Sequence, residues 1–167
     1  MADAGILGPG DRVELIDGEV LAKAPQTPAH ATAVQLAREA LRVAFRDGFD
    51  VRSQIPIALD QDNEPEPDIA VVAGSPRDYV DGHPSTALLI VEVAETSLGF
   101  DGGVKKALYA RFGVPEYWIV DLLAHRAEVH RSPQDDGYRD QQVLTEADSI
   151  APLARPITGV AVADLLP

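Results

Sequence analysis

The sequence contains no cysteine, so disulfide bonds and thiolate metal sites are excluded. Any bound metal ion would need oxygen or histidine ligands, and the absence of cysteine fits a reducing compartment. No stretch approaches the roughly 20 apolar residues that a membrane helix requires. The first residues, MADAGILGPGD, lack the basic and hydrophobic regions of a secretory signal. We therefore expect a cytoplasmic protein without membrane contact.

Basic residues are also scarce, because 14 lysines and arginines stand against 27 aspartates and glutamates, a formal net charge of −13. This balance argues against a protein that coats nucleic acid, which would show a basic face. The charge does not exclude an enzyme that acts on nucleic acid, because such an enzyme can concentrate a few cations at its site and bound metal ions change the local field. Aromatic residues make up only 5% of the chain, which argues against a glycosidase with an aromatic sugar-binding cleft.

The chain is long enough for a sizeable core, with 167 residues of which 46% are apolar. It contains no internal repeats, low-complexity tracts or linkers. We predict a single domain over residues 1–167, in which residues 1–11 form a loose N-terminal arm.

Local signals predict the order of helices and strands. Asp17-Gly18 predicts a tight hairpin within residues 12–24, and Thr27 followed by Pro28 predicts the capped start of a helix over 27–45. Alternating apolar residues from Val51 to Leu59 predict a half-buried strand. Further strands are predicted at 68–73, 87–94, 116–121, 126–131 and 138–146, and a second helix from about Val104 to Phe112. This order indicates an α/β or α+β fold with a mixed sheet flanked by helices, and the apolar run ALLIVEVA at its centre.

Three charged residues within fewer than forty positions are the main functional candidates. Asp68 opens the strand DIAVVA after the acidic turn NEPEP, and Lys105 follows the turn GFDGG at the start of a helix. Glu92 lies inside ALLIVEVA, where an ionised carboxylate is costly unless it is paired or bound to a metal. Strand alternation places Glu92 on the face of Ile90 and Ala94.

Two carboxylates on adjacent strands with a nearby lysine suit metal-dependent phosphodiester cleavage. The carboxylates would hold a divalent ion, and the lysine would steady the attacking water or the developing charge. Purely structural roles remain alternatives to the catalytic one, because Asp68 could be a turn residue and Glu92 could form a buried salt bridge with Lys105. His30, near the start of the first helix, could approach a phosphate, but we expect a surface role.

Three further residues are candidate neighbours of this site. Glu14, beside the hairpin turn, is a candidate third ligand. Asp101, Lys105 and Tyr109 are spaced four apart and would share one stripe of a helix that begins by Asp101. Asp101 would then cap the helix or orient Lys105, and Tyr109 would pack in the core or support the site residues.

Several motifs together resemble the Uma2 family of bacterial endonucleases, whose fold is restriction-endonuclease-like and of the PD-(D/E)xK type. They are ELIDGE, the dipeptide Pro67-Asp68, VEVAETS, the spacing Asp101-x-x-x-Lys105-x-x-x-Tyr109, and GVPEYWIVD. The resemblance covers roughly residues 11–166, and the block from Val91 to Asp121 is its most specific part.

The resemblance implies a mixed sheet of four or five strands with a Mg²⁺ site at one edge. Asp68 and Glu92 would bind the metal, and Lys105 would be the catalytic lysine. The general nuclease pattern has its lysine two residues after the second acid, where this chain has Ala94. Uma2-like sequences supply the lysine from the following helix, and Lys105 matches that position. The backbone carbonyl of Ala94 is a candidate further ligand.

We therefore predict a Mg²⁺-dependent endonuclease that cleaves nucleic acid, with DNA as the expected substrate and Mn²⁺ as a substitute ion. The alternative is a binding or regulatory module that keeps the nuclease fold without turnover. A homodimer is expected by analogy alone, since cutting both strands of a duplex usually needs two sites.

Overall fold

The computed structural model describes residues 12–167, so the arm expected over residues 1–11 lies outside the described part. Within residues 12–167, no helix is both long and apolar enough to cross a membrane. The strands are β1 (Val13–Ile16), β2 (Glu19–Ala22), β3 (Phe49–Ser53), β4 (Ile69–Ala73), β5 (Leu89–Ala94), β6 (Glu116–Asp121), β7 (Arg126–Gln134), β8 (Gly137–Thr145), β9 (Ser149–Ile150) and β10 (Val160–Ala161). The helical segments are α1 (Pro28–Phe45), η2 (Pro76–Tyr79), α2 (Leu98–Phe100), η3 (Asp101–Lys105), α3 (Lys106–Arg111) and η4 (Val162–Leu165).

The central sheet has six strands in the order β3-β4-β5-β6-β7-β8. Only β5 and β6 run parallel, and the other neighbours are antiparallel. Every residue of β5 and β6 is buried, as expected for parallel strands covered on both faces. The mixed sheet and the central position of β5 are confirmed. The expected number of four or five strands is wrong, because the long hairpin of β7 and β8 extends the sheet.

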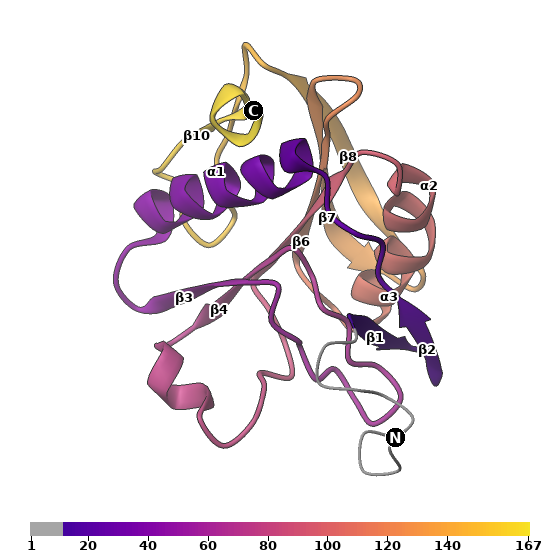
Figure 1. Ribbon diagram of the computed structural model, residues 1–167. Coiled ribbons are helices and arrows are strands. Elements are labelled where there is room, and N and C mark those ends of the chain that lie inside the picture. Colours follow the sequence, from indigo (N-terminus) through magenta and orange to yellow (C-terminus); the bar gives the residue numbers. More distant parts are fainter. Residues whose placement is uncertain (1–11) are drawn as a thin grey trace.

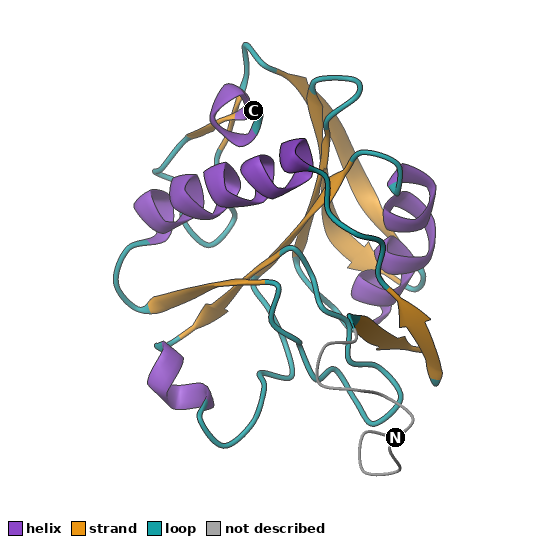
Figure 2. Cartoon of the chain, viewed as in Figure 1, coloured by secondary structure: helices purple, strands orange, loops and turns teal. Residues whose placement is uncertain are grey.

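Helices lie on both sides of the sheet, α1 on one face and α2 to α3 on the other (Figures 1 and 2). Each face carries its own apolar cluster, since Val91 and Val93 pack with α1 while Ile90 and Ala94 pack on the α3 side. The predicted alternation along β5 is therefore confirmed. It leaves Glu92 on the α3 side, where α3 and the hairpin of β1 and β2 cover the sheet.

Helix α1 begins as the sequence predicts. Thr27 is the N-cap, its hydroxyl oxygen accepts a hydrogen bond from the His30 N–H at 3.1 Å, and Pro28 occupies the first turn. Its buried residues recur at helical spacing and face the sheet, namely Ala33, Val34, Ala37, Leu41, Ala44 and Phe45. This placement leaves the first turn of α1, with His30, at the edge of the site described below.

The predicted hairpin is also confirmed, because Asp17 and Gly18 both have positive φ, at 50° and 77°. Its strand β1 is fixed to the loop before β4 by two backbone hydrogen bonds between Leu15 and Glu64, of 3.2 and 2.8 Å. A third joins the Gly18 N–H to the Asp62 carbonyl at 2.9 Å. The hairpin is thereby fixed over the α3 side of the sheet.

Two elements differ from the sequence-based expectation. The strand predicted from Val51 to Leu59 ends at Ser53, because Gln54 has a positive φ of 53° and Pro56 lacks an N–H. The helix predicted from Val104 begins at Leu98 and passes through η3, a π-helical turn, before α3. Such π-helical turns are rare and occur mostly as single turns within α-helices, often at functional sites.

The acid stability of the fold should depend on His130, which is 1% exposed and whose ring stacks on Tyr117 at a centroid distance of 5.8 Å. Burial lowers its pKa from 6.5 to about 4. Protonation therefore favours the unfolded chain, so its contribution is complete above pH 6.5 and declines as the pH falls towards 4, by roughly 1.4 kcal/mol per pH unit. Urea unfolding of His130→Phe should show a weaker loss of stability between neutral and acidic pH. The exposed His125→Gln serves as control, and an unchanged pH dependence in His130→Phe would contradict this role.

Candidate active site

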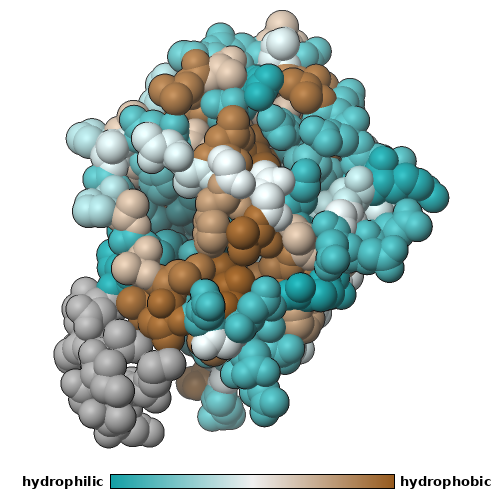
Figure 3. Space-filling view, turned by 90° about the vertical axis from the view of Figure 1, so that its right-hand side faces the viewer, coloured by the Kyte–Doolittle hydropathy of each residue, from teal (hydrophilic) through white to brown (hydrophobic). Residues whose placement is uncertain are grey.

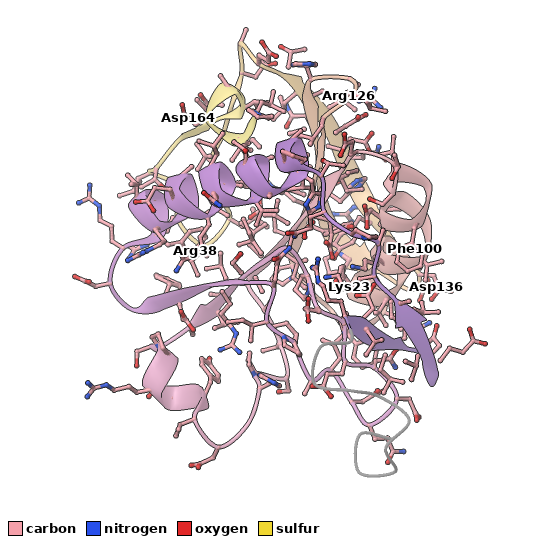
Figure 4. All side chains as sticks on the ribbon, in the orientation of Figure 1. Lys23, Arg38, Phe100, Arg126, Asp136 and Asp164 are labelled. Carbon is pink, nitrogen blue, oxygen red and sulfur yellow. The ribbon has the colours of Figure 1, made fainter. Side chains whose placement is uncertain are left out.

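Four charged side chains meet on the α3 side of the sheet, beneath the hairpin. Glu14 comes from β1, Asp68 precedes β4, Glu92 lies in β5 and Lys105 ends η3. Their exposed fractions are 6%, 6%, 2% and 3%. All four line a cleft of about 500 Å³, and Lys23 and Phe100, labelled in Figure 4, belong to the same cleft.

Lys105 lies between two carboxylates. Its ammonium nitrogen is 3.0 Å from Glu92 Oε1 and 3.1 Å from Glu14 Oε2. The Tyr109 hydroxyl donates to the same Glu92 oxygen at 2.9 Å. Lys105, which comes from the helical segment after β5, therefore reaches Glu92. The same contact is the buried salt bridge that the sequence offered as the structural alternative for Glu92. Tyr109 is buried, as expected, and contacts the site directly.

Asp68 and Glu92 are neighbours because β4 and β5 pair antiparallel, with Ile69 opposite Val91. The Asp68 N–H donates to Glu92 Oε2 at 3.2 Å, and the Val93 N–H donates to Asp68 Oδ2 at 2.9 Å. The predicted convergence of two carboxylates on adjacent strands is thus present in the structure.

His30 was expected at the surface, and the structure corrects this. Its Nε2 lies 3.2 Å from Asp68 Oδ2, with only 17% of the side chain exposed. Gln54 donates to the other Asp68 oxygen at 3.2 Å. The carboxylate of Asp68 is therefore held from both sides. Neither contact follows from a local motif, because both depend on how α1 and the end of β3 are positioned against β4.

The cluster contains more buried carboxyl groups than lysines, because Glu14, Asp68 and Glu92 surround Lys105. Burial raises the pKa of Asp68, but the hydrogen bond and charge of His30 outweigh this and hold the pKa at about 2. Burial raises the pKa of Glu92 to about 8, against the attraction of Lys105. Burial would lower the pKa of Lys105, but the carboxylates of Glu92 and Glu14 raise it above its ordinary value. Asp68 and Lys105 are therefore the firmly charged members.

Asp101 lies beside this cluster with 3% of its surface exposed. Burial raises its pKa to about 6, although the Ser97 hydroxyl donates to its carboxylate at 2.5 Å. The prediction that Asp101 caps a helix is wrong, because the helical segment already begins at Leu98. Its carboxylate instead adds to the negative potential at Lys105.

The donor set fits a hard divalent cation by its chemistry. Glu14, Asp68 and Glu92 offer carboxylate oxygens, which Mg²⁺ and Mn²⁺ prefer, and the excess of buried carboxyl groups favours a cation. Within residues 12–167, no group of three or more histidine, aspartate or glutamate side chains is close enough together to hold a metal ion. The Ala94 carbonyl accepts a hydrogen bond from the Leu122 N–H at 2.9 Å, and Ala94 is not among the residues that line the cleft.

The cleft also contains residues that the sequence did not single out. Lys23 donates from its ammonium to the Glu66 carbonyl at 2.6 Å and to the Glu66 carboxylate at 3.2 Å. Phe100 presents its ring to the Lys105 ammonium, 5.8 Å from the ring centroid. No local motif marks either residue, and only the tertiary contacts show that they share the cleft.

The six-stranded mixed sheet, the hairpin and the acid–lysine cluster define a restriction-endonuclease-like protein. A solved structure with this fold is that of a protein from Anabaena variabilis ATCC 29413, described as "a putative nuclease belonging to DUF820". The two chains are 15% identical, with a TM-score of 0.74 over 98% of this chain and 94% of that one. The sequence model of the Uma2 family, described as "Putative restriction endonuclease", matches residues 3–162. The chain therefore belongs to the Uma2 family. No curated protein matches the sequence.

Removing the lysine should reveal how much the fold depends on it. Lys105→Met leaves Glu92 and Glu14 buried without a counter-charge, so we expect the free energy of unfolding to fall by about 3 kcal/mol. Adding Glu92→Gln to Lys105→Met should recover part of this loss. Urea unfolding measures both, with the partly exposed neighbour Lys106→Met as control. Equal losses for Lys105→Met and Lys106→Met would show that the buried ion pair does not stabilise the fold.

Proposed function

We propose that the chain is a divalent-metal-dependent endonuclease that hydrolyses phosphodiester bonds of nucleic acid, with DNA as the substrate. One observation carries the proposal. Asp68 and Glu92 from adjacent strands and Lys105 from the following helix converge in one cleft, in a chain of the Uma2 family. The family supports a nuclease, and the arrangement of these side chains supports the metal dependence.

Asp68 and Glu92 would hold the ion, and the Ala94 carbonyl is the proposed further ligand. The expected ion is Mg²⁺, with Mn²⁺ as a substitute. Such an ion supplies positive charge that polarises the scissile phosphate and acidifies water. Glu14 lies 3.1 Å from Lys105, so we assign it to positioning the lysine first and to the ion second.

Lys105 would stabilise negative charge on the phosphate in the transition state. Its ammonium stays protonated, because the pKa is raised by the surrounding carboxylates. A charge fixed in a buried site costs no reorganisation when the reaction occurs. His30 would orient Asp68, whose second oxygen is held by Gln54.

A second function is favoured by a different observation. The oxygens of Asp68 and Glu92 already accept hydrogen bonds from other parts of the protein, and Lys105 already pairs with Glu92. A nuclease-fold binding or regulatory module without turnover would keep such a satisfied cluster for stability. We keep this module as the alternative. The net charge of −13 also favours it, because a negative surface weakens nucleic-acid binding.

Two further parts of the proposal rest on the sequence, a single nuclease domain over the whole chain and a cytoplasmic location. A homodimer rests only on analogy with enzymes that cut both strands of a duplex. The structure describes one chain, so the homodimer stays a prediction that analytical ultracentrifugation can test.

A cleavage assay tests the nuclease proposal. Supercoiled plasmid and single-stranded DNA are incubated with the protein in Mg²⁺, Mn²⁺ or EDTA. We expect metal-dependent cleavage that falls by roughly 100-fold or more in Asp68→Asn and in Glu92→Gln, because each removes a carboxylate that would hold the ion. Asp62→Asn and Glu64→Gln, on the loop before β4, are the matched controls. Cleavage that survives in both site variants would overturn the residue assignment, and no cleavage with any metal would favour the binding module.

Metal binding has a readout that does not depend on cleavage. An ion that binds only the folded chain raises its stability, so Mg²⁺ or Mn²⁺ should increase the thermal midpoint and EDTA should reverse the increase. The shift should disappear in Glu92→Gln and persist in Glu64→Gln. A shift of equal size in both variants would mean that the ion binds elsewhere.

A further inference from the structure

The cleft has an apolar wall that metal-dependent hydrolysis alone does not require. Leu21, Pro25 and Phe100 line it together with the charged residues. Leu21 and Phe100 pack against the apolar cluster under α3, so their positions are fixed by the core. Figure 4 shows Lys23 and Phe100 on separate elements, the hairpin and α2, that border the same cleft. An apolar wall beside a phosphate-cleaving centre suggests a surface for a nucleobase.

Phe100 is the aromatic member of this wall. Its ring centroid is 5.8 Å from the Lys105 ammonium. A base stacked on this ring would therefore belong to a nucleotide next to the phosphate at Lys105. Stacking on aromatic side chains is how proteins bind unpaired strands without reading their sequence.

Lys23 offers a phosphate contact at the other border of the cleft. An ammonium has three N–H donors, and hydrogen bonds to Glu66 use two of those of Lys23. Its side chain is 12% exposed, so the remaining donor has access to the cleft but not to a broad surface. Arg12 lines the same border, 4.0 Å from Glu66.

The shape and charge of the site disfavour an intact duplex. Asp68, Glu92 and Lys105 are almost fully buried within a cleft of about 500 Å³, a volume typical of small-ligand sites. Duplex binding also needs many lysines and arginines along the phosphates. The side of the molecule that carries α2 and α3 shows a hydrophobic area beside hydrophilic residues (Figure 3).

We propose that the substrate is an unpaired strand of nucleic acid, one base of which stacks on Phe100 while its phosphates lie between Lys23 and Lys105. A paired base remains inside the duplex and cannot reach the ring. The inference rests on the proposed nuclease function and names the substrate class of that site. One cut in one strand needs only one active site, so a monomer suffices for this reaction.

Cleavage of three matched oligonucleotides tests the proposal. The same labelled strand is offered alone, in a full duplex, and in a duplex with a central unpaired bubble, each with Mg²⁺ or Mn²⁺. We expect cleavage of the single strand and of the bubble, confined to its unpaired residues, with the full duplex about tenfold slower or worse. Equal or faster cleavage of the full duplex would overturn the inference and leave the nuclease intact.

Binding in EDTA separates the two proposals, because it needs no turnover. Fluorescence anisotropy of the same strands with the native protein should show tighter binding of the single strand than of the duplex. Such a preference without any cleavage would retain the cleft as a single-strand site and overturn the nuclease. Equal binding together with absent cleavage would overturn both.

Variants of Phe100 test whether a base of the bound strand stacks on its ring. Phe100→Leu keeps an apolar side chain without a stacking face, so single-strand binding should weaken about tenfold. Phe112→Leu is the matched control, because Phe112 packs on the same apolar cluster without lining the cleft. In Phe100→Trp the stacking face is retained, and the single strand, but not the duplex, should quench the introduced indole. Native binding by Phe100→Leu, or no quenching in Phe100→Trp, would overturn the role of this ring.

Discussion

The arrangement of the site depends on one buried charge, the ammonium of Lys105. Glu92 lies in the middle of a strand whose every residue is buried, and a carboxylate there needs a partner. Lys105 provides it and binds Glu14 as well, so one side chain joins β5, the helical segment after it and the hairpin. The position of the hairpin over the sheet, and hence the depth of the cleft, follows from this ion pair together with the backbone bonds to the loop before β4.

Much of the fold could be predicted because its signals are local. Thr27 with Pro28 defines the start of α1, and Asp17 with Gly18 defines the hairpin, since both depend on a few neighbouring residues. The alternation along β5 likewise follows from strand geometry. The meeting of Asp68, Glu92 and Lys105 needed more than local signals, and the family motifs supplied it.

The rest of the site could not be predicted, because it depends on contacts between distant segments. His30 lies on α1 and Gln54 follows β3, yet both bind Asp68. Phe100 and Lys23 lie on different elements and share a cleft only after the hairpin has folded over the sheet. The π-helical turn from Asp101 to Lys105 was likewise not predicted, since such turns are rare.

The π-helical turn separates two roles, catalysis and sheet packing, that one strand combines in the general nuclease pattern. Where a lysine shares a strand with the second acid, the strand must serve both the reaction and the packing of the sheet. Here the position two residues after Glu92 is Ala94, which packs in the core under α3. The lysine comes instead from a turn outside the sheet. Strand β5 can therefore remain an almost wholly apolar centre of the sheet, paired antiparallel with β4 and parallel with β6.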